Sequence, residues 1–465
     1  MTTSPKTHPS VWKEVGAVAS CLFGLYALSV FGLLNFDKWS VRAVDTKTIG
    51  LLLGILFGTY VSLIFSPPRF RKRIHLASAA LSGVSFCGFY AGYIVLLSSL
   101  FFGLVLLRWK MRFKILAVVV VFELLAYLLL DVFLGQPSGD GFFYFGFLFC
   151  LIFMYRYALF FFHMEQSKSK IPSFSDFLLY MFLTPFWILV PHIAVMPGYR
   201  YFMESDRPGD PAVRWSGLRL ILWGATLVLL AKLSGFVWEL TQIPDVPAFP
   251  LWIRSWGQTF NAILISDLLS RPLYVLLYLS GHAHILVGMI RLLGFDLKPV
   301  FDRPFLSRDI FEFYNRIMIY YREFLVTVFY FPLQLAFRKL APWQNRAVAL
   351  VFTLTAGYAL TSFLGLGLDL CDMVYAPEYA AANSPLIYTK GILSAMPEHG
   401  SAWVWLHTSL ASFSLSVLIV ALFAAGLMHL IGSIKKGWDF FGARGLKISL
   451  AFLTYSFVIA FLLDP

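Results

Sequence analysis

The sequence predicts an all-α protein, a polytopic bundle of transmembrane helices. Of its 465 residues, 59% are hydrophobic and only 13% are charged, whereas charged residues make up about a quarter of an ordinary soluble domain. Apolar runs long enough to cross a bilayer as a helix, about 20 residues each, recur along the chain. These runs are continuous, which favours helices over alternating membrane strands. We expect about 11–13 helices.

The expected spans follow from these apolar runs. They lie at residues 15–34, 49–65, 75–107 (two crossings), 115–133, 142–162, 174–193, 217–236, 260–279, 348–366, 403–431 and 448–463. Pro185 and Pro191 predict a kinked or re-entrant helix in the run 174–193, because proline removes a backbone donor. The segment 198–215 is rich in charged residues, proline and glycine, and we expect a polar linker there.

The net charge of +12 comes from basic residues gathered in short segments between the apolar runs. This is the positive-inside pattern of a multi-pass membrane protein, so it does not indicate nucleic-acid binding. Clusters at 69–73 and 108–114 are expected on the cytoplasmic side of a bacterial inner membrane. The segment 369–402 carries four acidic residues against one lysine and is expected to be external.

Ionisable residues gather in the segment 280–340. Such residues are costly at membrane depth and usually mark a site or an internal network. His282 and His284 are two positions apart, so on a helix they point about 200° apart and cannot bind one metal ion from the same face. No metal-ligand spacing occurs elsewhere, and we expect no metal. Two interpretations of these histidines stay open: hydrogen-bonded residues of the bundle interior, or members of a site.

Polar residues recur at largely helical spacing over residues 301–322. Their candidate binding members are Arg303, Arg308, Asn315, Arg316 and Arg322. One interpretation is an amphipathic helix at the membrane interface, with a polar face that is solvated or ion-paired. The other is the wall of a funnel that binds an anionic group, such as a phosphopantetheine or a pyrophosphate.

Three blocks of the sequence resemble a known family. They read SFSDFLLYMFLTPFWILVPHI, GLRLILWGATLVLLAKL and, from residue 280, SGHAHILVGMIRLLGFDLKPVFDRPFLSRDIFEFYNRIMIYYREFLVTVFYFPL. In this order and spacing they resemble the membrane-bound O-acyltransferases (MBOATs), most closely the bacterial branch of D-alanyl and alginate acetyl transfer proteins. The resemblance covers residues 174 to 366 and implies a helix bundle around a central funnel.

The chain departs from that family at its two characteristic polar positions. A variable His, Asn or Asp corresponds to Met318, and the near-invariant His of a GLWHG helix falls near Leu360. A hydrocarbon or thioether side chain cannot act as a general base. If the chain is active, His282 and His284 are the candidates that would take over catalysis.

The resemblance divides the chain into N-terminal transmembrane helices (1–173), an MBOAT-like core (174–368), an external loop (369–402) and C-terminal transmembrane helices (403–465). It implies a degenerate, non-catalytic member, a pseudoenzyme that binds membrane lipids and a protein partner in a bacterial envelope complex. The alternative is an active O-acyltransferase that moves an acyl group from a cytoplasmic thioester donor to an envelope glycan or lipid. No other cofactor is expected.

Overall fold

The structure is a computed structural model, and it describes part of the chain. The described residues are 9–34, 46–87, 103, 156, 159–164, 172–182, 197–207, 209–241, 271–304, 312, 315–342, 344–346 and 348–353. They form helices and connecting segments, with no β-strand among them, so the expected all-α class is confirmed for this part. Arg308, Leu360, the segment 369–402 and the expected spans at 403–431 and 448–463 lie outside the described residues.

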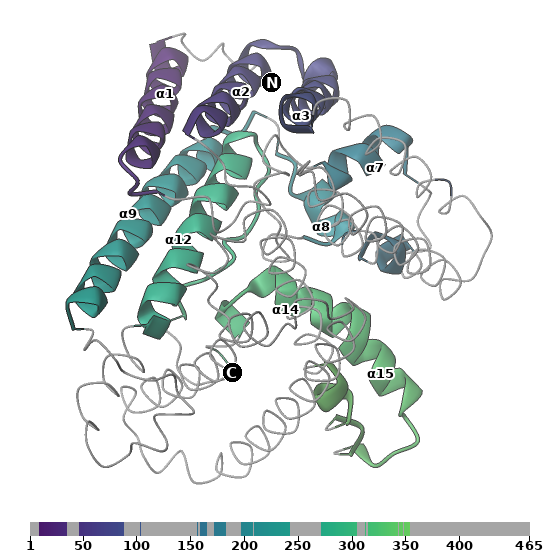
Figure 1. Ribbon diagram of the computed structural model, residues 1–465. Coiled ribbons are helices and arrows are strands. Elements are labelled where there is room, and N and C mark those ends of the chain that lie inside the picture. The colour runs from purple at the N-terminus through teal and green to yellow at the C-terminus, as the bar shows by residue number, and fades with distance from the viewer. Residues whose placement is uncertain are drawn as a thin grey trace, which may run out of the picture. The chain divides into compact units, whose positions relative to one another are not determined.

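Eleven helical elements follow one another along the described residues (Figure 1). They are α1 (Pro9–Val30), α2 (Thr46–Phe65), the 3-10 turn η1 (Pro68–Phe70), α3 (Arg71–Cys87), α7 (Phe174–Met181), α8 (Tyr199–Glu204), α9 (Pro211–Thr241), α12 (Arg271–Leu292), α14 (Ile319–Leu325), the π-helical turn η5 (Val326–Tyr330) and α15 (Phe331–Ala336).

Two of these helices could cross a membrane. The segments Val11–Val30 of α1 and Pro211–Leu233 of α9 are long and apolar enough, by length and composition. The segments Ile49–Phe65 of α2 and Leu276–Leu292 of α12 are apolar but shorter.

Several helix boundaries differ from those expected: α1 begins at Pro9 rather than residue 15, and α3 begins at Arg71 rather than residue 75. α9 begins at Pro211 rather than near residue 217, so the last part of the expected polar linker is helical. The start is set locally, because the Asp210 carboxylate accepts a hydrogen bond from the Ala212 N–H at 2.9 Å and proline is favoured in a first helical turn. The remainder of that linker contains α8. α12 runs from Arg271 to Leu292, so it extends well past the expected end at residue 279.

The chain divides into two compact units. Described residues up to 233 and from 276 to 301 belong to the first unit, and described residues 234–241, 271–275 and 302–353 belong to the second. In the second unit, α14, η5 and α15 follow one another without a break. The π turn directly precedes Pro332 of α15, whose missing N–H and bulky ring disturb the regular helix. The division into four segments that the sequence suggests stays a prediction.

α9 and α12 run side by side in the first unit (Figure 1) and meet through four glycines. A Cβ placed on Gly217 would lie 2.7 Å from the Gly288 oxygen, and one placed on Gly224 would lie 2.5 Å from the Gly281 oxygen. The pairing of 217 with 288 and of 224 with 281 makes the helices antiparallel. Glycines seven residues apart lie on nearly the same face of a helix. The two backbones therefore touch along this face, where a residue with a side chain would not fit.

The first unit exposes apolar side chains and buries polar ones. Phe23 of α1 is 72% exposed, and Leu222, Trp223 and Leu233 of α9 are each more than half exposed. Its buried residues include polar ones: Glu14, Ser29, Thr59, His75, Ser78, Ser82, Arg156, Ser205, Ser280, His282 and His284. Water would disfavour this distribution, whereas the hydrocarbon of a bilayer accepts it.

Candidate functional site

α12 carries both histidine candidates, and both are buried. His282 is 5% exposed and His284 is 6% exposed. The Nδ1 atom of His282 lies 2.8 Å from the Tyr278 carbonyl oxygen, and that of His284 lies 2.6 Å from the Ser280 carbonyl oxygen. A carbonyl oxygen can only accept, so Nδ1 donates in both rings. Both histidines are therefore tied to their own helix one turn back, which fits the interpretation as residues of the bundle interior.

The glycine contact with α9 sets the direction of the two rings. Gly281 faces α9, and at 3.6 residues per turn His282 is rotated from it by about 100° and His284 by about 60° the other way. The histidines thus lie on either side of the α9–α12 contact. The Tyr278 ring lies 4.2 Å from the His282 ring, centroid to centroid.

The described residues include no group of three or more His, Cys, Asp and Glu side chains that could hold a metal ion. The two histidines diverge around α12, as their spacing predicts. Their Nδ1 hydrogen bonds to backbone carbonyls orient both rings.

A second polar cluster, which the sequence analysis did not single out, lies at the C-terminal end of α12. One terminal nitrogen of Arg71 is 2.7 Å from the Asp206 carboxylate and 2.9 Å from the Leu293 carbonyl oxygen. The guanidinium also lies over the Phe295 ring, 5.7 Å from its centroid. Gly294 has a φ of +92°, and a Cβ there would lie 2.6 Å from the guanidinium. The positive φ favours glycine at position 294, and a larger residue would also displace the guanidinium of Arg71.

Backbone hydrogen bonds also join residues 205–207, next to Asp206, to residues 294–296, which follow α12. The Arg207 N–H donates to the Gly294 carbonyl at 2.9 Å, and the Asp296 N–H donates to the Ser205 carbonyl at 2.8 Å. His75, one turn along α3 from Arg71, packs its ring 5.2 Å from that of Phe295. The basic run at 69–73 indicated only which side of the membrane it faces, yet Arg71 within it fixes α3 to the end of α12.

An aromatic layer continues from Phe295. Phe202 stacks on it at 4.7 Å between centroids, and Tyr180 lies 5.9 Å from Phe202 and 5.3 Å from Tyr199. Burial, followed by the negative charge of Asp176, raises the pKa of Tyr199 to about 12. The Tyr199 phenol is therefore protonated at physiological pH and acts as a packing residue.

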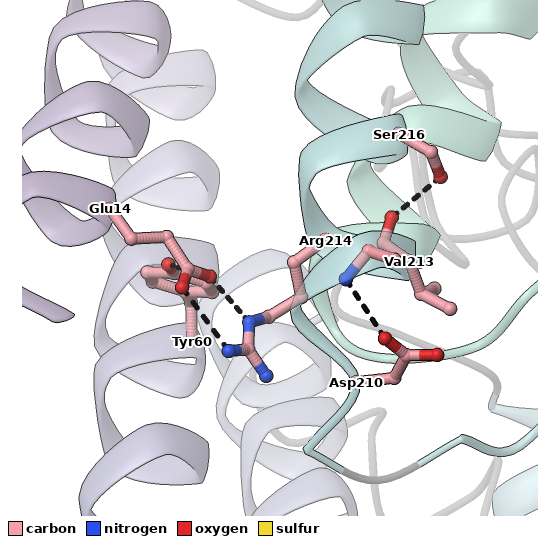
Figure 2. Close-up of polar contacts among 7 residues, drawn as sticks. Glu14, Tyr60, Asp210, Val213, Arg214 and Ser216 are labelled. Carbon is pink, nitrogen blue, oxygen red and sulfur yellow. Dashed lines mark hydrogen bonds and ion pairs between the residues drawn. The ribbon is translucent and has the colours of Figure 1, made fainter. Parts of the chain in front are cut away.

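A buried ion pair joins three helices of the first unit (Figure 2). The Nε atom of Arg214, on α9, lies 2.5 Å from Oε1 of Glu14, on α1, and its terminal nitrogen lies 3.2 Å from Oε2. The hydroxyl of Tyr60, on α2, donates to Oε1 of Glu14 at 2.9 Å. The side chains of Arg214 and Glu14 are 15% and 8% exposed. In the sequence, Glu14 stands beside Lys13 directly before the expected apolar run 15–34, so its position did not indicate a buried partner.

In the second unit, Arg316 binds the chain itself. Its guanidinium donates to Glu312 at 2.6 Å and to the Arg303 carbonyl oxygen at 3.2 Å. The Asp302 N–H donates in return to the Arg316 carbonyl at 2.9 Å. Arg322 similarly donates to the Asn315 carbonyl at 2.5 Å and to the Asn315 side chain at 2.9 Å. Arg316 and Arg322, two of the predicted binding residues, thus stabilise the backbone around them. Arg303 is exposed.

Met318 has a left-handed backbone conformation, with a φ of 45°. It is the residue before α14, which begins at Ile319. A continuous amphipathic helix over residues 301–322 is therefore wrong, because residues 317 and 318 form a bend and residues 301–303 are not helical. Left-handed backbone is costly for a residue with a Cβ and often marks functional sites. Met318 thus lies at the bend itself.

Comparison with known proteins does not extend this picture. No family model matches the sequence, and no curated protein matches it.

Proposed function

We propose that the chain is a multi-pass protein of the bacterial inner membrane with an MBOAT-like helix bundle. Within that bundle it is a non-catalytic, lipid-binding subunit of an envelope complex. The observation that carries the proposal is the left-handed bend at Met318. The backbone is strained there, and the side chain at that position is a thioether, which cannot act as a general base.

Membrane embedding is supported by the distribution of polarity in the first unit. Large apolar side chains of α9 are exposed, among them Leu222, Trp223, Leu229, Leu230 and Leu233, while Glu14 and Arg214 are paired inside. Charged residues in a bilayer face the bundle interior and pair with one another. Basic residues between the apolar runs favour a cytoplasmic position for those segments, and the acidic segment 369–402 is then external.

Loss of catalysis is supported by how the remaining polar candidates are used. Arg316 and Arg322 are occupied by Glu312, Asn315 and backbone carbonyls. An anionic acyl donor would have to compete with these partners. His282 and His284 donate from Nδ1 to their own helix.

Active O-acyl transfer is the alternative function, and one observation favours it. Because Nδ1 of His282 and of His284 is the donor, a neutral ring carries its lone pair on Nε2. A general base needs this tautomer, held by a hydrogen bond at its other nitrogen. In that case a cytoplasmic acyl thioester would supply the acyl group.

Incubating the purified protein with labelled acyl thioester distinguishes the two functions. We expect no thioester turnover above the buffer rate, because no general base stands at Met318. The variants His282→Ala and His284→Ala are measured beside the natural chain, with exposed Lys47→Ala as a matched control. Turnover by the natural chain that is lost in either histidine variant but kept in Lys47→Ala contradicts the non-catalytic proposal. Inertness of the natural chain together with co-purification of a partner contradicts the enzymatic one.

A further inference from the structure

An exposed corner of the first unit combines cations with aromatic rings. It consists of Trp12, Phe65, Arg69, Phe70 and Arg73, and we call it the basic–aromatic corner. The Arg69 guanidinium lies 4.9 Å from the Phe70 ring centroid and that of Arg73 lies 6.0 Å from it. Residues 69, 70 and 73 share one face of the first helical turns, since positions i and i+4 lie above one another.

The other basic residues of the same run, Arg71 and Lys72, are held in ion pairs within the first unit. Arg71 is 13% exposed and bonds Asp206, and Lys72 forms an ion pair with Asp176. Arg69 and Arg73, in contrast, are exposed and form no ion pair with any described residue. Two of the four cations thus stabilise the fold, and the two on the outer face are available to a ligand.

The aromatic members lie at the ends of the apolar helices. Trp12 is in the first turn of α1 and Phe65 is the last residue of α2, and their ring centroids are 5.5 Å apart. Trp12 is 62% exposed, Phe65 51% and Phe70 36%. Aromatic rings at the ends of membrane helices typically lie at the level of the lipid headgroups.

We propose that the basic–aromatic corner binds the headgroup of an anionic phospholipid in the cytoplasmic leaflet. This inference rests on the membrane embedding that is part of the proposed function. A guanidinium can donate two parallel hydrogen bonds to a phosphodiester. Arg69 and Arg73 supply that recognition, while Trp12, Phe65 and Phe70 lie against the upper acyl chains. The combination of unpaired cations with exposed rings fits a lipid better than a free phosphate, which would use only the cations.

Native mass spectrometry of the purified chain tests this site. The detergent-solubilised protein is mixed with equal amounts of phosphatidylglycerol and phosphatidylcholine, and the retained lipids are counted. We expect a preference for phosphatidylglycerol that falls with added salt, because exposed charges are screened. Arg69→Gln/Arg73→Gln should weaken phosphatidylglycerol retention about 25-fold, or about fivefold for each arginine. Arg69→Lys/Arg73→Lys keeps both charges but loses the two parallel donors, so its preference should fall between those of the natural chain and of Arg69→Gln/Arg73→Gln.

Lys47→Gln is the matched control, because Lys47 is an exposed cation at the opposite end of α2. The size-exclusion profile and melting temperature of every variant are recorded, so a folding defect is not mistaken for a binding defect. Equal retention of both lipids by the natural chain, or an equal loss in Lys47→Gln, overturns the site. Carbonate extraction of membranes separates the two proposals. A chain that resists extraction but shows no lipid preference overturns only the lipid site, and a chain released by carbonate overturns both.

Discussion

Replacing Arg214 with methionine is expected to destabilise the protein by about 3–5 kcal/mol, the usual cost of leaving a buried charge without its partner. Glu14 is 6% exposed, and Arg214 supplies two of the hydrogen bonds to its carboxylate. Methionine keeps much of the arginine stem's volume and removes the charge. Among the described residues, only the Tyr60 hydroxyl would then bond the carboxylate. The loss is measured as a lower apparent melting temperature of the detergent-solubilised protein, followed by size-exclusion chromatography.

Two further variants isolate the cause. Arg219→Met removes an exposed arginine from the same helix and should leave the melting temperature unchanged. The double variant Glu14→Gln/Arg214→Met removes both charges and should recover most of the loss, because neutral groups in place of a buried pair are often tolerated. If the double variant were as unstable as Arg214→Met alone, the stranded carboxylate would not be the cause and lost packing of the arginine stem would explain the effect.

The apolar helices could be predicted because membrane-length runs are a strong local signal. α2 begins three residues before its expected start, α1 begins six residues before, and the run of α9 was placed correctly in its interior. The start of α9 was missed since Asp210 and Pro211 were read as linker residues, although an aspartate followed by proline is also a helix start. The composition of a long window does not tell whether such residues belong to a linker or begin a helix.

The polar contacts of the site depend on positions far apart in the chain. The Glu14–Arg214 pair joins residues 200 positions apart, and Arg71 meets Leu293 across 222 positions. Each residue was visible in the sequence as a charge near an apolar run, but the choice of partner follows from how α1, α3 and α9 pack. The hydrogen bonds of His282 and His284 are different, because a donor four residues after a carbonyl on one helix is a local arrangement. That interpretation was available from the sequence alone.

The left-handed bend at Met318 could not be predicted from residue type. Methionine favours helix, and the polar residues on either side recur at helical spacing. What overrides this preference is the set of hydrogen bonds that Arg316 makes to Glu312 and to the Arg303 carbonyl, together with the Asp302–Arg316 backbone bond. These tie the segment before α14 to residues 302 and 303, and the chain must turn at residue 318 to continue into that helix.

Replacing Gly224 with alanine is expected to separate α9 from α12. The new Cβ would lie 2.5 Å from the Gly281 carbonyl oxygen and 2.8 Å from the Ile285 backbone nitrogen. Overpacking usually costs about 1–3 kcal/mol, and here the upper end is expected because backbone atoms cannot rotate away as a side chain can. The double variant Gly217→Ala/Gly224→Ala adds the same clash against Gly288. The expected result is a stepwise fall in melting temperature, measured for the detergent-solubilised protein.

Gly54→Ala on α2 is the matched control, because a Cβ there meets nothing within 4 Å. In that open helical position alanine should be neutral or stabilising, by up to about 1 kcal/mol. Equal melting temperatures for Gly224→Ala and the natural chain would contradict the close α9–α12 contact. The same contact keeps His282 and His284 buried on either side of Gly281. Faster labelling of the histidines by diethyl pyrocarbonate in Gly224→Ala, but not in Gly54→Ala, would therefore show that the glycine contact is what shields them.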